Sequence, residues 1–200
     1  MKIITVAHQK GGVGKTTLTL NLASCLQKTG LNIGVLDTDL QGSLTDTNHT
    51  LEGITFVPYE ELSNFGSMPY DFLIIDTPPY LTNSLNDLFG ISEYVLIPTN
   101  IGVYDIMAIR ATLSIVKKAQ QSKPNLKYGV VLNRVRANTS LINDILDMLE
   151  NYQAIVLKTR IHERISYARG ALTSGVFGTE DSKAQEEIFN LTEEIINTLQ

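Results

Sequence analysis

Short continuous apolar runs alternate with longer stretches of helical periodicity along the whole chain. Continuous Val, Ile and Leu runs predict buried strands, and apolar positions at helical spacing predict amphipathic helices. Strands are predicted at 3–8, 32–39, 71–79, 94–100, 128–135 and 154–159, with a weaker candidate at 54–62, and helices at 15–28, 104–121, 139–151 and 183–199. Because strands separated by helices form parallel sheets covered on both faces, we expect a doubly wound α/β fold with a mostly parallel sheet.

The composition is that of a soluble globular protein. Hydrophobic residues make up 43% of the 200 residues and charged residues 18%, and the formal net charge is -5. This predicts one domain over 1–200, and the negative charge argues against coating by nucleic acid through bulk charge. Cys25 is the only cysteine, so neither a disulfide framework nor a cysteine metal site is available. With no signal-peptide pattern and no apolar run near the roughly 20 residues that span a bilayer, we expect a cytoplasmic protein.

The stretch AHQKGGVGKTTLTL at 7–20 follows the first predicted strand and opens the first predicted helix. A phosphate-binding loop requires that context, because glycines turn the backbone tightly and a helix N-terminus attracts anions. In such a loop Lys15 reaches the β- and γ-phosphates of ATP, and the hydroxyl of Thr16 binds Mg²⁺. The predicted ATP contacts are Gly11, Gly12, Val13, Gly14, Lys15, Thr16 and Thr17. A glycine turn with chance neighbours is the weaker alternative.

The loop departs from the ordinary phosphate-binding pattern in two places. Position 9 is Gln where that pattern has Gly, and Lys10 adds a second lysine to the loop. The stretch K-G-G-V-G-K-T resembles the deviant Walker A family of partition and positioning ATPases, the ParA/MinD group. This resemblance implies a P-loop NTPase fold of the deviant Walker A type and ATP hydrolysis, with ATP and Mg²⁺ as cofactors.

The same resemblance suggests why the loop carries two lysines. In that family the lysine at the position of Lys10 reaches the nucleotide of a second subunit, which implies a catalytic role for Lys10 beside Lys15 and an ATP-dependent homodimer. A cation from another chain stabilises transition-state charge only once the dimer has formed, which couples hydrolysis to assembly. The alternative for Lys10 is a solvated surface lysine.

Aspartates follow two predicted strands at the edge where ligands bind in parallel sheets. Asp37 and Asp39 point to one face because strand side chains alternate. VLDTDLQGS resembles the family's D-x-D-P-Q element, which implies that Asp39 positions the attacking water, although Leu40 replaces the usual proline. FLIIDTPP resembles the family's Walker B element, which implies that Asp76 holds the magnesium shell. We expect a catalytic Asp39 and a metal site of Thr16, Asp37 and Asp76; turn or capping roles are the alternative for the first two aspartates.

A third predicted strand end, VVLNRV, carries Asn133 and Arg134. An asparagine amide can pair with the edge of adenine, as the corresponding residue does in MinD-like members of the family, and Arg134 could flank the base. The resemblance thus adds Asn133 and Arg134 to the ATP-binding set. Loop capping is the alternative, because polar side chains at a strand end often serve that purpose.

Basic residues are concentrated in the second half of this net-acidic chain. Between 110 and 136 there are seven and no Asp or Glu, and between 158 and 169 four more stand against one Glu. A local basic surface suits sequence-independent contact with the DNA backbone. ParA-like proteins bind nonspecific DNA through basic residues late in the chain, so the resemblance implies DNA contacts by Arg160, Arg164 and Arg169. The alternative is that the lysines of the first stretch only solvate a helix face.

The C-terminal segment KAQEEIFNLTEEIINTLQ carries four Glu against one Lys. MinD-like proteins end in a basic amphipathic helix that lies on anionic membranes; this helix has the opposite charge, so no membrane partner is expected. Its apolar residues are predicted to pack on the domain: Ile188, Phe189, Leu191, Ile195, Ile196 and Leu199. Larger plasmid ParA proteins carry a DNA-reading domain ahead of the first strand. We expect this chain to leave sequence-specific reading to a partner.

These observations favour a ParA-like ATPase that dimerises with ATP, binds nonspecific DNA and moves or spaces plasmid or chromosome DNA. The resemblance implies a ParB-like centromere-binding or cargo-adaptor protein that stimulates hydrolysis, and association with the nucleoid when ATP is bound. Alternatives are a MinD-like or other positioning ATPase acting on protein or membrane cargo, and a metabolic P-loop enzyme acting on a small molecule. A non-catalytic binding module is disfavoured because Lys15, Thr16, Asp39 and Asp76 form a complete hydrolytic set.

Overall fold

The computed structural model describes residues 1–39, 53–80, 84–136, 141–170 and 173–200. Within these residues, seven strands form one sheet in the order β3-β2-β4-β1-β5-β6-β7. The strands are β1 (Lys2–Val6), β2 (Ile33–Asp37), β3 (Ile54–Val57), β4 (Phe72–Asp76), β5 (Tyr94–Asn100), β6 (Lys127–Val135) and β7 (Val156–His162). The predicted α/β fold is confirmed, and every strand pair is parallel. The weak candidate at 54–62 forms a strand only over β3, after which the chain continues into the 3-10 helix η2 (Tyr59–Ser67).

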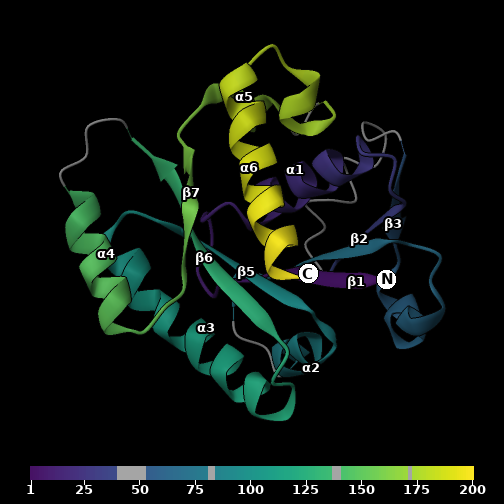
Figure 1. Cartoon of the computed structure of the whole chain (residues 1–200), viewed down its shortest axis with the longest axis horizontal. Helices are drawn as coiled ribbons and strands as arrows, with labels where there is room; N and C mark the ends of the chain where they lie inside the picture. The colour runs from purple at the N-terminus through teal and green to yellow at the C-terminus, as the bar shows by residue number, and fades with distance from the viewer. Residues whose placement is uncertain (40–52, 81–83, 137–140, 171–172) are drawn as a thin grey trace.

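Helices cover both faces of the sheet (Figure 1). One face carries α1 (Lys15–Gln27), α5 (Ile165–Arg169), the 3-10 helix η4 (Gly175–Gly178) and α6 (Ser182–Thr198), and the other carries α2 (Ser84–Ile91), α3 (Val103–Ser122) and α4 (Leu141–Asn151). Successive strand residues point to opposite faces, so each helix layer buries its own apolar cluster. In β1, for example, Ile4 packs under α1 and α6, and Ile3 packs under the layer of α2 and α3.

The strand β1 is central in the sheet, and the order of the strands reverses beside it. β4 lies on one side and β5 on the other, with Val6 in register with Asp76 in the first pair and with Leu96 in the second. On the far side of β4, Asp37 is in register with Asp76. Ligands of parallel sheets bind at the carboxyl ends of strands where the order reverses. The glycine loop, Asp37 and Asp76 therefore come together at that edge.

The edge strand β7 runs to His162, past the predicted end at 159, and α6 packs along it. Glu194 of α6 accepts hydrogen bonds from the backbone N–H groups of Lys158 and Thr159, and Glu187 accepts one from that of His162. These carboxylates satisfy backbone donors that an uncovered sheet edge leaves unpaired. The acidic residues of α6 thus stabilise the sheet edge as well as the helix surface.

The predicted packing of the C-terminal helix is confirmed for most of its apolar residues. Ile188, Leu191 and Ile195 are buried, and Ile196 and Leu199 pack against the same cluster. The prediction for Phe189 is wrong, because that side chain is 52% exposed. Phe189 follows a buried residue directly and so lies about 100° further around the helix, away from the sheet. No helix in the described part of the chain is long and apolar enough to cross a membrane.

Candidate nucleotide-binding site

The glycine loop begins directly after β1 and ends at the first turn of α1. Gly12 (φ 75°) and Gly14 (φ 94°) have left-handed backbone conformations that residues with a Cβ rarely adopt. At Gly14 a Cβ would also clash with the side-chain nitrogen of Asn133. The carbonyl of Gly14 accepts a hydrogen bond from the N–H of Leu18 (2.9 Å) in the first turn of α1. These two glycines therefore place a helix N-terminus at the carboxyl end of β1, where it can bind an anion.

Lys15, the first residue of α1, is a buried cation. It is only 7% exposed, and its Nζ donates a hydrogen bond to the carbonyl of Lys10 (3.3 Å). Burial lowers the pKa of Lys15, while the carboxylates of Asp76 and Asp39 act in the opposite direction. Because burial outweighs the two carboxylates, an anion in the loop would stabilise the charged form of this lysine. The site therefore fits the predicted contact of Lys15 with phosphate.

Thr16 and Asp76 are in contact where β4 ends. The hydroxyl of Thr16 donates to Oδ2 of Asp76 (2.5 Å), and the hydroxyl of Thr19 donates to Oδ1 (3.4 Å). Asp76 is 1% exposed, and burial raises its pKa to about 7, an effect to which the charge of Asp37 adds. A carboxylate and a hydroxyl side by side supply the oxygen ligands that Mg²⁺ prefers, and a cation there would favour the ionised carboxylate.

In the described part of the chain, the carboxylates at this edge of the sheet do not form a metal site by themselves. Within the described ranges, no three or more His, Cys, Asp or Glu side chains are grouped so that they could hold a metal ion. Mg²⁺ usually keeps several waters and binds one or two carboxylates together with phosphates of a substrate. The predicted set of Thr16, Asp37 and Asp76 fits that mode, with Thr16 in contact with Asp76 and Asp37 in register beside it.

A short turn ties the end of β2 to the end of β4. Oδ1 of Asp37 accepts a hydrogen bond from the N–H of Asp39 (2.8 Å), and Thr38 donates to the carbonyl of Asp76 through its N–H (3.1 Å) and its hydroxyl (2.7 Å). Asp37 thus has the turn-forming role that the sequence left open. Asp39 is half-buried, and its charge acts to raise the pKa of Lys15. The catalytic role of Asp39 stays a prediction. Leu40 lies outside the described residues.

The second lysine of the loop points to a different element. Nζ of Lys10 forms an ion pair with Oδ1 of Asp105 in the first turn of α3 (2.6 Å), and the lysine side chain is 43% exposed. Gln9 donates to the carbonyl of Ala108 on the same helix (2.5 Å). Nδ1 of the buried His8 accepts the N–H of Lys10 (2.9 Å). Sequence reasoning missed His8 and Asp105. Their only signals are a histidine directly before the loop and an acid early in a predicted helix.

A cavity of about 230 Å³ lies beside the glycine loop. It is formed by the start of α1, the end of β6 and the segment from β7 into α5, and its lining residues are Gly14, Thr17, Leu18, Asn133, Arg134, His162, Glu163, Arg164, Tyr167 and Ala168. The predicted base contacts Asn133 and Arg134 therefore share one cavity with the loop. His162 and Tyr167 were not predicted to lie here, because the sequence suggested only a basic surface for that segment.

Asn133 is buried, and both ends of its amide are bonded within the chain. Nδ2 donates to the carbonyl of Val13 (2.7 Å), and Oδ1 accepts a hydrogen bond from the N–H of Arg134 (2.9 Å). Arg134 has a left-handed backbone (φ 52°) and an exposed side chain. Asn133 thus braces the glycine loop, and its contact with adenine stays a prediction.

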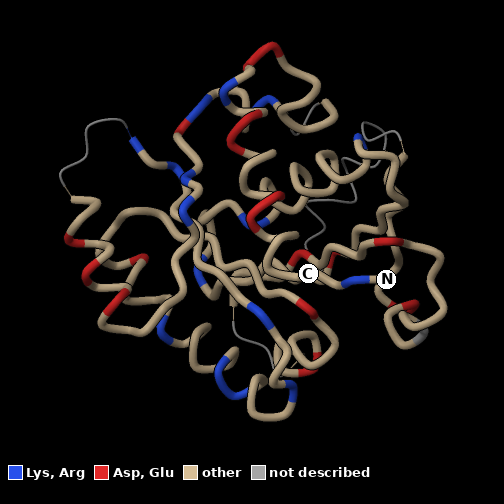
Figure 2. The backbone as a smooth tube through the Cα atoms, in the orientation of Figure 1, with Lys and Arg blue, Asp and Glu red and all other residues tan. Residues whose placement is uncertain are grey.

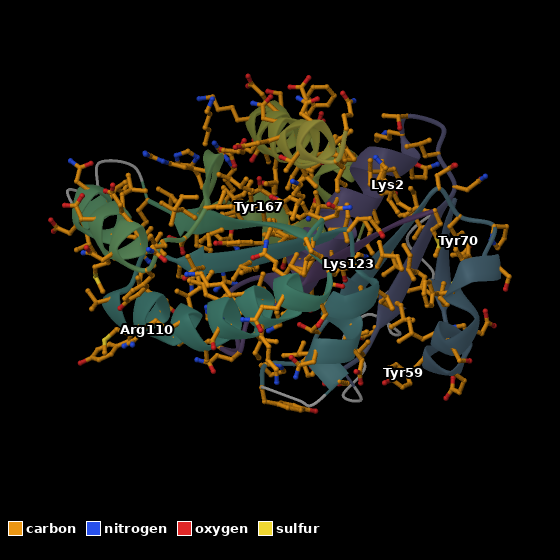
Figure 3. The ribbon with its side chains drawn as sticks, turned by 60° about the horizontal axis from the view of Figure 1, so that its bottom comes forward. Lys2, Tyr59, Tyr70, Arg110, Lys123 and Tyr167 are labelled. Atoms are coloured by element: carbon orange, nitrogen blue, oxygen red, sulfur yellow. The ribbon has the colours of Figure 1, made fainter. Side chains whose placement is uncertain are left out.

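The three predicted DNA contacts have different surroundings. Arg160 and Arg169 are exposed. Arg164 is only 23% exposed, and it donates to Oε1 of Glu187 through Nη2 (2.6 Å) and Nε (3.1 Å). The hydroxyl of Tyr167, a residue labelled in Figure 3, donates to the other oxygen of Glu187 (2.9 Å). Arg164 therefore joins the start of α5 to α6, whereas Arg160 and Arg169 face solvent.

The basic stretch from 110 to 136 includes most of α3 and all of β6, and Lys and Arg predominate over acidic residues there (Figure 2). Arg110 lies over the ring of Tyr152 (5.5 Å to its centre). Lys123, which is labelled in Figure 3, follows the last residue of α3 and pairs with Glu93 (3.1 Å). Part of this stretch therefore makes contacts within the fold.

A glycine loop between a parallel strand and a helix, with a buried lysine and a threonine–aspartate pair beside it, defines a P-loop nucleotide-binding protein. Residues 4–174 match the model of the family described as the CobQ/CobB/MinD/ParA nucleotide binding domain, and the chain belongs to this family. The resemblance to the ParA/MinD group is thereby confirmed.

Individual relatives extend over almost the whole chain. The chain is 28% identical over 208 residues to maintenance of carboxysome distribution protein A of Halothiobacillus neapolitanus, with 96% of this chain and 95% of that protein covered. Its structure is similar to that of a Borrelia burgdorferi protein assigned to plasmid partition and bound to AMPPNP (TM-score 0.76, 21% identity, 98% of both chains). It is also similar to cobyrinic acid a,c-diamide synthase of Mycobacterium smegmatis bound to an ATP analogue and magnesium (TM-score 0.80, 20% identity, 98% and 94% covered). At such identities the two structures show the fold alone.

Proposed function

We propose that this chain is an ATPase that dimerises with ATP and Mg²⁺, binds DNA without sequence preference and positions a cargo. Plasmid or chromosome DNA is the proposed cargo. The proposed partner is a ParB-like centromere-binding or cargo-adaptor protein that stimulates hydrolysis. In the cell the protein would be cytoplasmic and associated with the nucleoid while ATP is bound.

The observation that carries the proposal is the different placement of the two lysines of the glycine loop. Lys15 is buried at the start of α1, close enough to Asp76 for the carboxylate to act on its pKa. Lys10 points outward to α3, with its side chain 43% exposed. One lysine suffices for the chain's own nucleotide, so the outer one is available to the nucleotide of a second copy. A cation that arrives with the second subunit makes hydrolysis depend on assembly.

Each predicted residue has a role in this proposal. Bound Mg²⁺–ATP would supply the phosphoryl group that is transferred to water. The loop from Gly11 to Thr17 holds the phosphates, and Thr16 and Asp76, with Asp37 beside them, hold the metal ion. Asp39 orients the attacking water. The base lies in the cavity that Asn133 and Arg134 border.

The exposed arginines Arg160 and Arg169 are the proposed DNA contacts, and Arg164 holds the segment between them in place. No membrane partner is proposed, because the C-terminal helix is acidic and its residues Glu187 and Glu194 bind the edge strand.

A protein assembly is the second candidate cargo. The chain is similar over nearly its full length to a protein named for carboxysome distribution. A positioning ATPase of this kind would use the same nucleotide site with a different adaptor.

Binding of a random-sequence DNA duplex tests the proposal, measured with Mg²⁺–ATP, with Mg²⁺–ADP and without nucleotide across a salt series. We expect binding only with ATP, and binding that weakens as salt rises, because contacts with phosphates release counterions. Arg169→Ala should weaken binding and lower the salt slope by about one. Lys183→Ala removes an exposed lysine on α6, outside both basic stretches, and serves as the control, with no change in DNA binding expected.

The outcomes separate the parts of the proposal. ATP-dependent dimerisation without DNA binding in any nucleotide state would contradict the DNA role and favour a protein or membrane cargo. Turnover of ATP by a monomer that needs a small-molecule acceptor would instead favour a metabolic P-loop enzyme.

A further inference from the structure

Lys10 is held within its own chain at three points. Its N–H donates to Nδ1 of His8 (2.9 Å), its carbonyl accepts a hydrogen bond from Nζ of Lys15 (3.3 Å), and its ammonium pairs with Asp105 (2.6 Å). The first two contacts fix the backbone of Lys10 and leave its side chain free to turn. The ion pair with Asp105 is therefore the contact that decides where the ammonium points.

Asp105 is placed to hold a cation and also to release it. It is only 13% exposed, and it lies in the first turn of α3, where the positive end of the helix stabilises a carboxylate. Its Oδ2 folds back so closely over Gly102 that a Cβ there would lie 2.6 Å away. The helix N-terminus would still stabilise the charge of Asp105 after Lys10 has left.

The residues beside Asp105 form an exposed apolar surface. Tyr104 is 81% exposed, Met107 is 52% exposed and Val103 is 43% exposed, although all three are large apolar side chains. They occupy the first two turns of α3, the helix whose first turn carries Asp105. A second copy of the chain that covers the start of α3 would lie close to the ion pair, and its bound nucleotide would carry more negative charge than one carboxylate.

We propose that Asp105 is a positioning residue that holds Lys10 against its own chain, and that the phosphates of the partner's nucleotide take the lysine from it on dimerisation. This inference rests on the proposed function. Asp105 thereby weakens the dimer and keeps Lys10 away from the chain's own nucleotide until a second subunit is present. It does not touch the reacting atoms.

Asp105→Asn tests the inference, because asparagine keeps the shape and removes the charge. A partly exposed ion pair changes an equilibrium constant about threefold, and dimerisation releases one such lysine from each of the two subunits. We therefore expect the dissociation constant of the dimer formed with Mg²⁺–AMPPNP to fall about tenfold, as measured by sedimentation velocity. Asp144→Asn removes an exposed carboxylate from the first turn of α4 and is the matched control, with no change expected.

A second variant separates this role from a structural one. In a Lys10→Gln background the Asp105→Asn change should have no effect on the dimer, because the lysine it releases is gone. A separate measurement uses mass spectrometry to follow the acetylation of Lys10 in the monomer without nucleotide. Asp105→Asn should raise the rate of this acetylation, because it removes the ion pair that holds the ammonium.

The results distinguish this inference from the proposed function. If the wild-type chain dimerises and the dimer of Asp105→Asn is equally stable or less stable, Asp105 does not hold Lys10 back. That result would overturn the inference and leave the proposed function standing. The inference would also be overturned if Asp105→Asn changed the dissociation constant of the dimer equally in the wild-type and the Lys10→Gln backgrounds. A wild-type chain that stays monomeric with Mg²⁺–AMPPNP would overturn the proposed dimer and, with it, the role of Asp105 in dimerisation.

Discussion

His8 makes the stability of this protein depend on pH in a way that can be measured directly. It is 2% exposed, and its Nδ1 accepts the N–H of Lys10 (2.9 Å). Burial, together with the positive charges of Lys15 and Lys10, lowers the pKa of His8 to about 4, and only Asp105 acts in the opposite direction. In the folded chain His8 is therefore neutral at pH 5, whereas an unfolded chain with an ordinary histidine pKa of about 6.5 binds a proton there.

The sign and size of the effect follow from this difference in proton binding. Because the unfolded state binds the extra proton, the contribution of His8 to stability is fully present above pH 6.5 and is lost as the pH falls towards 4. One pKa unit corresponds to about 1.4 kcal/mol, so a shift from 6.5 to about 4 corresponds to about 3 kcal/mol in the free energy of unfolding. His8→Asn keeps an acceptor for the backbone N–H and removes the titration.

Urea denaturation of both chains between pH 4 and pH 8 measures the effect. The free energy of unfolding of wild type minus that of His8→Asn should fall by about 3 kcal/mol from pH 7 to pH 4. The raised pKa of Asp76 makes stability fall as the pH rises towards 7, but it is common to both chains and cancels in the difference. A difference that stays constant across this range would refute the reasoning and show that the folded chain protonates His8 as readily as the unfolded chain does.

Two further predictions concern the ends of the nucleotide site. Glu187→Gln should lower the free energy of unfolding by about 2–3 kcal/mol, because it removes the nearer of the two carboxylates that pair with the partly buried Arg164 and leaves only Asp181 at 4.0 Å. It should also weaken nucleotide binding, because Arg164 lines the cavity beside the glycine loop. Chemical denaturation and nucleotide titration check this, and equal stability of Glu187→Gln and the exposed control Glu186→Gln would contradict it. Gly14→Ala should abolish nucleotide binding in a titration, because a Cβ at φ 94° would clash with the amide of Asn133 that braces the loop. The control Gly90→Ala has nothing within 4 Å of the new Cβ and should bind as wild type does; normal binding by Gly14→Ala would show that the loop needs no glycine there.

Much of the fold was predictable because its signals are local in the chain. Buried parallel strands are continuous apolar runs, so six of the seven strands of the sheet stand out in the sequence. The edge strand β3 has only four residues, with a mixture of buried and exposed positions, and its pattern is correspondingly weak. The helix α2 has only eight residues, too short for its periodicity to be distinctive.

The glycine loop of the candidate site was predictable for the same reason. Its residues from Gly11 to Thr17 are consecutive, and strand and helix patterns flank them directly. Asp76 could be recognised because a charged residue at the end of four apolar strand residues is uncommon without a partner. The structure supplies partners for it in the hydroxyls of Thr16 and Thr19 on α1.

Only the tertiary structure decided how side chains from distant segments are used. Asn133 contacts the loop across 120 positions, Arg164 contacts Glu187 across 23, and Lys10 pairs with Asp105 on a helix that follows β5. None of these pairs has a periodicity or a spacing that could reveal it. The sequence by itself thus predicted which residues form the candidate nucleotide site, since they lie within one loop and at three strand ends. The packing of helices on the sheet decided which charges pair within the fold and which, such as those of Arg160 and Arg169, face solvent.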